Sequence, residues 1–177
     1  MASLRRGLLI GMAIRSLVGD APFRAAIKTA FLRIDTCGFA AVIVPYVSLE
    51  PEIVQCTAGA VAAELGLTPD RVSVDQSVID RSGLPARRPP LVDLDPESER
   101  GLGILAAAAR ALLIRAAAEH WRIDPAGCRA VGGAIRDPTG RRSVTFAQIA
   151  RDAPLQDLPT AVRLCSGAQF PLYRESR

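Results

Sequence analysis

The chain has 177 residues and a mass of 18.8 kDa, with 49% hydrophobic and 23% charged residues. These values are typical of a globular protein and exclude a disordered tail, and no run approaches 18 uninterrupted apolar residues, so no membrane span is expected. The net charge of +4 is carried almost wholly by arginines, which are scattered along the sequence without interleaved aromatic residues, so no nucleic-acid partner is expected.

The amino-terminal segment, residues 1–28, is predicted to hold a short helix. Arg5 and Arg6 precede an apolar stretch, in the outline of a twin-arginine export signal. Arg15 interrupts that stretch early, and no Ala-x-Ala cleavage site follows it. We therefore expect a cytoplasmic protein, with periplasmic location through twin-arginine export as the alternative.

Residues 29–153 are predicted to form one α+β domain, in which a small sheet of short strands and hairpins packs against two main helices. Residues 31–34 and 41–44 have the composition of strands. The turn between them, 35–38, starts with Asp and closes with Gly. Residues 72–74 alternate apolar and polar positions and are expected to add a third strand.

Proline and glycine residues predict where the two main helices begin and end. The first is expected to begin at Glu50 and Pro51, because proline has no N–H to lose in a first helical turn, and to end at Gly66. A proline-rich break at 82–97 is expected to precede the second helix, residues 98–121.

Beyond the second helix, the predicted strands and helix are only a few residues long. Residues 128–135 and 142–145 are predicted to form a hairpin around the Asp-Pro-Thr-Gly turn at 137–140. A Thr-x-x-Gln capping box at 145–148 starts a short last helix. Residues 154–177 show no clear period and are expected to form an irregular tail.

Residues able to carry chemistry are scarce. His120 is the only histidine and lies near the expected end of the second helix, where a structural role is more common than a catalytic one. Ser48 and Ser166 lack a nucleophile-elbow pattern, and Gly132-Gly133 fits either a turn or a close approach to a ligand. No catalytic residue is therefore predicted.

The four cysteines form no Cys-x-x-Cys pair, so no metal site is expected. In an alanine-rich chain such cysteines are most often buried, small hydrophobic residues in a reducing compartment. The four are Cys37, Cys56, Cys128 and Cys165.

Several stretches in order resemble the start of the molybdopterin-binding subunit of molybdenum hydroxylases. They lie at 31–35, 42–45, 62–65, 71–74 and 107–113, and then at Trp121, 124–125, 128–129, 140–142 and 145–146. The variety that they resemble most is the isoquinoline 1-oxidoreductase β-subunit type, within the xanthine dehydrogenase and aldehyde oxidase group. The resemblance covers residues 31–152.

In that family, the large subunit holds a molybdenum–pterin cofactor and oxidises aldehydes or N-heterocycles with a water-derived oxygen. A glutamate activates the metal-bound hydroxyl, and electrons leave through an iron–sulfur subunit. The resemblance places that glutamate in later domains of the family, so it assigns the role to no residue of this chain.

The chain departs from the family where the cofactor would bind. Members typically carry Met-Gly-Gln-Gly after the second strand, and the corresponding residues here are Leu49, Glu50, Pro51 and Glu52. Pro51 removes a backbone donor, and the two glutamates would repel an anionic pterin. A second loop, which is Gly-rich in the family, is acidic and proline-rich here at 90–95. The cofactor-binding residues of this chain are therefore unknown.

The resemblance implies a stand-alone or truncated relative of the molybdopterin-binding subunit that is not catalytic by itself. No cofactor is expected on the isolated chain, and molybdenum–pterin only as part of a larger enzyme. One alternative is a protein-interaction or oligomerising module on the same fold. Another is one chain of a split aldehyde or N-heterocycle oxidoreductase. The expected partner is a second copy of the chain or a larger subunit.

Overall fold

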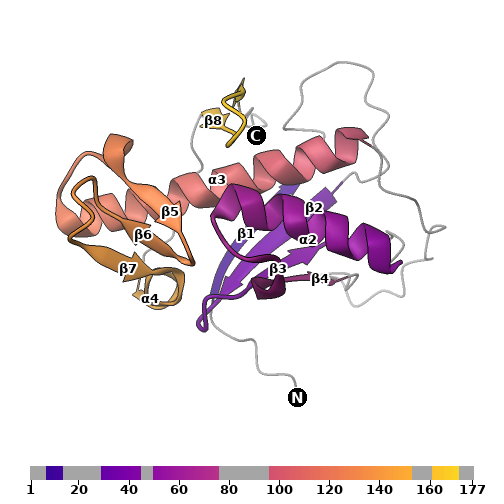
Figure 1. The fold of residues 1–177 in the computed structure, drawn as a ribbon, viewed down its shortest axis with the longest axis horizontal. Coiled ribbons are helices and arrows are strands. Elements are labelled where there is room, and N and C mark those ends of the chain that lie inside the picture. The colour runs from indigo at the N-terminus through magenta and orange to yellow at the C-terminus, as the bar shows by residue number, and fades with distance from the viewer. Residues whose placement is uncertain (1–6, 14–28, 45–49, 76–95, 153–160, 172–177) are drawn as a thin grey trace, which may run out of the picture.

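Two helices and a four-stranded sheet form the centre of the computed structural model, which describes residues 7–13, 29–44, 50–75, 96–152 and 161–171 (Figure 1). The sheet has the order β1 (Gly7–Ala13), β2 (Thr29–Asp35), β3 (Ala40–Ile43) and β4 (Val72–Asp75). β1, β2 and β3 are antiparallel neighbours, whereas β3 and β4 are parallel. A parallel pair needs a crossover, which α2 (Pro51–Leu65) provides. The predicted α+β class is confirmed.

The predicted helix near the amino terminus is wrong for Gly7–Ala13, which form β1. All seven residues pair with β2, from Gly7 opposite Asp35 to Ala13 opposite Thr29. Pairing with a partner strand outweighs the weak helix preference of a segment that contains two glycines. The Arg5-Arg6 pair lies outside the described residues.

The predicted turn between the first two strands of the domain is confirmed. The Asp35 carboxylate accepts hydrogen bonds from the backbone N–H groups of Cys37, at 2.8 Å, and of Phe39, at 3.0 Å. Gly38 has a φ of +83°, a conformation that glycine adopts without strain.

The predicted ends of the first main helix are also confirmed, since α2 begins at Pro51 and ends at Leu65. Gly66 follows with a φ of +69°. A Cβ at this position would lie 2.4 Å from the backbone oxygen of Ala130, so the close approach of another segment also requires glycine.

The second main helix, α3 (Pro96–Trp121), begins two residues earlier than predicted. Pro96 occupies the first turn, where its missing N–H costs no hydrogen bond.

Within the described residues, Glu99–Trp121 of α3 is long and apolar enough to cross a membrane, with a mean hydropathy of 1.6. However, 67% of its most apolar 18-residue stretch is buried inside the protein, as is usual for a core helix. The core joins β2, β3, α2 and α3, and its largest buried side chains include Leu32, Ile34, Leu65, Leu105 and Leu113.

A second sheet lies beside the carboxyl-terminal end of α3 (Figure 1). It consists of β5 (Arg129–Val131), β6 (Ala134–Arg136) and β7 (Ser143–Thr145), all antiparallel, and α4 (Phe146–Asp152) follows it. One hairpin was predicted here, but the structure has two. Gly132 and Gly133, at φ +61° and +80°, form the additional tight turn between β5 and β6.

The capping box is confirmed at the start of α4. The Gln148 side chain accepts from Thr145 N–H at 2.9 Å, and Gln148 N–H donates to Thr145 Oγ1 at 3.2 Å. Short 3₁₀ turns at Pro69–Arg71 and Pro125–Gly127 precede β4 and β5.

The carboxyl-terminal tail is not irregular over residues 161–171, which include a hairpin of β8 (Ala161–Arg163) and β9 (Gln169–Pro171). Val162, 3% exposed, packs with Ile104 and Ala108 of α3. Strands of three residues are too short to show a period in the sequence, and it is contact with α3 that holds this hairpin.

Candidate functional site

Three of the four residues that the resemblance matches to a cofactor loop, Glu50, Pro51 and Glu52, lie at the start of α2. Leu49 lies outside the described residues. Glu50 is the residue before the helix, with no side-chain capping hydrogen bond, and Pro51 and Glu52 occupy its first turn. All three are exposed. Their side chains therefore offer carboxylates, and no hydroxyl or ammonium group, at the positive end of the helix dipole.

The other residues singled out in the sequence do not gather into a site. His120 is exposed in the last turn of α3, and Ser166 is exposed in the turn between β8 and β9. Gly132 and Gly133 form a hairpin turn. Ser48 and residues 90–95 lie outside the described part of the chain, and within that part no three metal-binding side chains cluster.

The cysteines are less buried than expected. Only Cys128 is buried, whereas Cys37, Cys56 and Cys165 are exposed, and all four are free thiols. The expectation of four buried cysteines is therefore wrong for three of them. The small buried residues of the core are mostly alanines instead.

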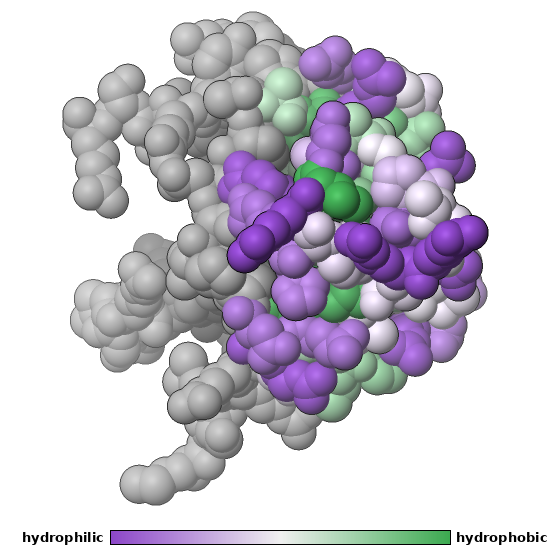
Figure 2. Space-filling model, turned by 90° about the vertical axis from the view of Figure 1, so that its left-hand side faces the viewer, coloured by the Kyte–Doolittle hydropathy of each residue, from purple (hydrophilic) through white to green (hydrophobic). Residues whose placement is uncertain are grey.

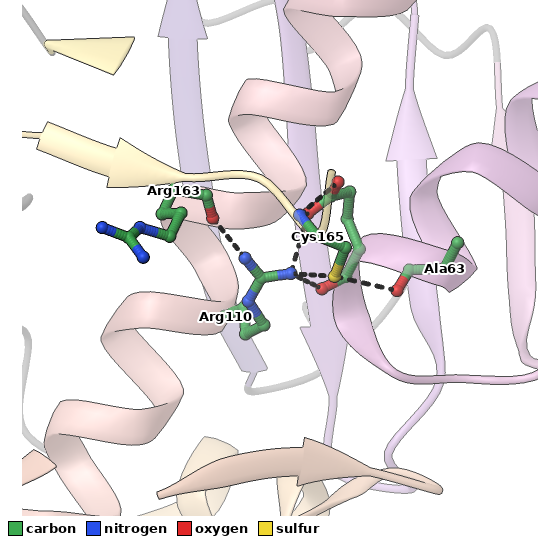
Figure 3. Close-up of polar contacts among 5 residues, drawn as sticks. Ala63, Arg110, Arg163 and Cys165 are labelled. Atoms are coloured by element: carbon green, nitrogen blue, oxygen red, sulfur yellow. Dashed lines mark hydrogen bonds and ion pairs between the residues drawn. The ribbon is translucent and has the colours of Figure 1, made fainter. Parts of the chain in front are cut away.

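A polar cluster missed at the sequence level joins α2, α3 and the β8–β9 hairpin (Figure 3). We call it the Arg110 junction, and it consists of Ala63, Glu64, Arg110, Arg163 and Cys165. The Arg110 guanidinium lies 2.7 Å from the Glu64 carboxylate and also donates to the Glu64 backbone oxygen. Its second terminal nitrogen donates to the backbone oxygen of Arg163.

Cys165 completes the junction from the hairpin side. Its backbone N–H donates to the two Glu64 carboxylate oxygens at 2.9 and 3.0 Å. Its sulfur lies 2.8 Å from Arg110 Nη1 and 3.6 Å from the backbone oxygen of Ala63 (Figure 3). The Glu64 carboxylate therefore accepts from two segments that are far apart in the sequence.

The electrostatics of the junction favour a structural role. The side chains of Arg110 and Glu64 are only 15% and 12% exposed, so water screens their attraction little. Although Cys165 is exposed as a residue, partial desolvation of its thiol, together with the neighbouring Glu64 carboxylate, raises the pKa of that thiol, and the Arg110 charge opposes this shift. Through the ion pair and the hydrogen bonds of Cys165, the Arg110 junction fastens three elements together.

One sequence signal could have revealed the junction. Between residues 101 and 118, α3 is almost entirely apolar, and Arg110 and Arg115 are its only charged residues there. A charge within such a stretch implies a buried partner. The identity of that partner could not be predicted, because Glu64 lies 46 residues away in the sequence.

The comparisons with known proteins reveal a likeness of fold. The chain matches no family model and no curated protein. Among solved structures, it is similar to quinoline 2-oxidoreductase from Pseudomonas putida 86, with a TM-score of 0.51 and 16% sequence identity. The match covers 67% of this chain and only 15% of the other chain. The chain therefore shares its fold with a small part of quinoline 2-oxidoreductase, a molybdenum hydroxylase.

Proposed function

We propose that this chain is a stand-alone or truncated relative of the amino-terminal part of a molybdenum hydroxylase large subunit and is not catalytic on its own. The observation that carries the proposal is the match in fold to quinoline 2-oxidoreductase over 67% of the chain. It agrees with the resemblance of residues 31–152 to molybdopterin-binding subunits.

The start of α2 does not fit a molybdenum–pterin cofactor. A phosphate-bearing pterin is held by backbone N–H groups and cationic side chains, as anions are at other helix starts. Here the helix begins with Pro51, which has no N–H, and Glu50 and Glu52 expose two carboxylates beside it. This donor set supports the proposal that the isolated chain binds no such cofactor.

Metal and pterin analysis of the purified protein tests the proposal. The protein is produced in a host that synthesises the cofactor, with quinoline 2-oxidoreductase prepared in parallel as the positive control. We expect molybdenum and pterin fluorescence well below stoichiometric amounts in this chain. Stoichiometric amounts of both in the purified protein would overturn the non-catalytic part of the proposal.

A split enzyme is a second candidate function, because the fold of this chain matches one part of the quinoline 2-oxidoreductase chain. In this case, a second polypeptide would supply the remaining domains of an aldehyde or N-heterocycle oxidoreductase. Co-purification of a larger molybdoprotein with the tagged chain is the expected result. Recovery of the chain without such a protein, from the cells that naturally make it, would count against this candidate.

A third candidate, a protein-interaction or oligomerising module, is favoured by two exposed arginines that are neighbours across β5 and β6. These are Arg129 and Arg136, and neither has an acidic partner among the described residues. Light scattering tests the homo-oligomer directly: we expect a mass above that of one chain if the module binds to itself. A strict monomer at micromolar concentration would leave only a different protein as the partner.

A further inference from the structure

The sheet of β5, β6 and β7 has two unlike faces. Ala130, Ile135 and Val144 are opposite one another across the three strands and pack on the hydrophobic core. Because side chains alternate along a strand, the neighbouring positions point away from the core. We call this outer surface the arginine face, and it consists of Arg129, Val131, Ala134, Arg136, Ser143 and Thr145.

Two arginines are direct neighbours on this face. Arg129 of β5 pairs with Arg136 of β6, and both are exposed. Among the described residues, neither has an acidic partner, and neither makes a side-chain hydrogen bond. Like charges directly opposite each other weaken a strand pair, so this arrangement contributes nothing favourable to the fold.

The segment that contains this pair is cationic. Residues 122–145 contain five arginines and two aspartates, so this segment alone has a net charge of +3. Arg142 donates to the backbone oxygen of Trp121 at 3.5 Å, which brings the β6–β7 turn next to Arg122 at the end of α3. The expectation of scattered arginines is therefore wrong for this part of the chain.

The two aspartates are occupied within the fold. Asp137 is 9% exposed and accepts hydrogen bonds from the Thr139 hydroxyl, at 2.8 Å, and from Arg142 N–H, at 3.1 Å. Asp124 accepts from Ala126 N–H at 2.9 Å. Neither carboxylate pairs with Arg129 or Arg136.

Figure 2 shows the end of the molecule that carries β5, β6 and β7 as predominantly hydrophilic, with small hydrophobic spots.

The other side chains of the arginine face indicate the class of ligand. Val131 is 48% exposed, one of the two most exposed large hydrophobic side chains among the described residues. No aromatic side chain belongs to the face, so it lacks the stacking surface that single-stranded nucleic acid requires. Arginine is enriched at protein–protein interfaces, and the exposed Val131 beside it adds apolar surface that a partner can cover.

We propose that the arginine face binds an acidic segment of another protein, whose carboxylates pair with Arg129 and Arg136 and whose apolar side chain covers Val131. The guanidinium fork binds carboxylates through two parallel hydrogen bonds, which gives such contacts their specificity. This inference stands on the sheet alone and does not depend on a relationship to molybdenum hydroxylases, so the cofactor analysis above leaves it unaffected.

Fluorescence anisotropy with a labelled peptide of alternating glutamate and leucine tests the proposal on the full chain. We expect the double variant Arg129→Ala/Arg136→Ala to bind the peptide about tenfold more weakly than the wild type, equivalent to about 1.4 kcal/mol. The matched control is Arg100→Ala/Arg151→Ala, which removes the same charge from exposed positions on α3 and α4 and should change affinity less than about twofold.

Two further measurements sharpen the test. Val131→Asp should weaken peptide binding while circular dichroism remains that of the wild type, because the side chain is exposed. A labelled single-stranded oligonucleotide of equal charge should bind more weakly than the peptide. Equal losses in the two double variants, tighter binding of the oligonucleotide, or no binding of the peptide by the wild type would each overturn the proposal.

Discussion

Arginine performs opposite tasks in two regions of this protein. In the Arg110 junction, one guanidinium is nearly buried, paired with Glu64 and bonded to backbone oxygens of two segments. On the arginine face, Arg129 and Arg136 are exposed, adjacent and unpaired among the described residues. The first arrangement uses its charge to hold the fold, whereas the second leaves its charge available to a ligand. Substitutions should therefore affect stability in one region and binding in the other.

The two regions meet at Gly66, where we expect the largest effect. Gly66→Ala would place a Cβ 2.4 Å from the Ala130 backbone oxygen, at a φ of +69° that alanine adopts with strain. We expect a loss of about 3–5 kcal/mol in the free energy of unfolding, measured by urea denaturation. Gly59→Ala is the matched control: it lies inside α2 with open space around it and should stabilise the protein by about 0.5–1 kcal/mol.

A Gly66→Ala protein as stable as the wild type would show that α2 and β5 do not approach each other closely. The close contact of Gly66 with the Ala130 backbone, which links the Arg110 junction to the sheet of the arginine face, would then be absent. The Gly59→Ala control excludes a general effect of alanine on the helix.

The Arg110 junction comes next in expected size. Arg110→Met leaves the Glu64 carboxylate nearly buried without its charge partner and should lower the free energy of unfolding by about 3 kcal/mol. Combining it with Glu64→Gln in a double-mutant cycle should give a coupling energy of about 1–3 kcal/mol. Arg100→Ala, at an exposed position of α3, should change stability by less than about 0.5 kcal/mol. Independent effects of the two junction variants would show that the ion pair contributes nothing.

The stability of the turn between β6 and β7 should depend on pH through the carboxyl group of Asp137. Burial opposes ionisation of this carboxyl, but hydrogen bonds from Thr139, Arg142 and Arg141, together with the Arg142 charge, outweigh burial and lower its pKa below 3.8. A lowered pKa in the folded state means that the carboxylate stabilises the fold above the unfolded value and that this contribution is lost as the pH falls through the folded value.

Asp137→Asn should therefore lower the melting temperature at pH 7, and the difference from the wild type should shrink as the pH falls below about 4. Thermal unfolding followed by circular dichroism over this range measures it. If the difference in melting temperature stays constant from pH 7 to pH 3, the hydrogen bonds of the turn contribute to stability and the charge of Asp137 does not.

Local chemistry made much of the fold predictable from the sequence. The Asp35 turn, the ends of α2 and the capping box at Thr145 each depend on residues within a few positions of one another, and all three are confirmed. By contrast, β1 and the β8–β9 hairpin depend on pairing or packing with distant elements, so no local pattern indicated them.

The two arginine regions were missed for different physical reasons. Arg110 finds its partners 46 and 55 residues away, and single-sequence patterns carry no information on such contacts. Arg129 and Arg136 are only seven positions apart, and they become neighbours because Gly132-Gly133 turns the chain back on itself. Two adjacent glycines between short apolar stretches are a known hairpin signal, so this pairing could have been predicted.

The smallest effect on stability is expected on the arginine face itself. Arg129→Ala/Arg136→Ala removes two like charges that lie opposite each other across β5 and β6, so the free energy of unfolding should stay within about 0.5 kcal/mol of the wild-type value or rise slightly. Any gain should fade as salt screens the repulsion in the wild type. Urea denaturation at low and high salt measures both effects. A loss as large as that of Arg110→Met would mean that these arginines have partners within the fold, and they would then not be free to bind an acidic segment.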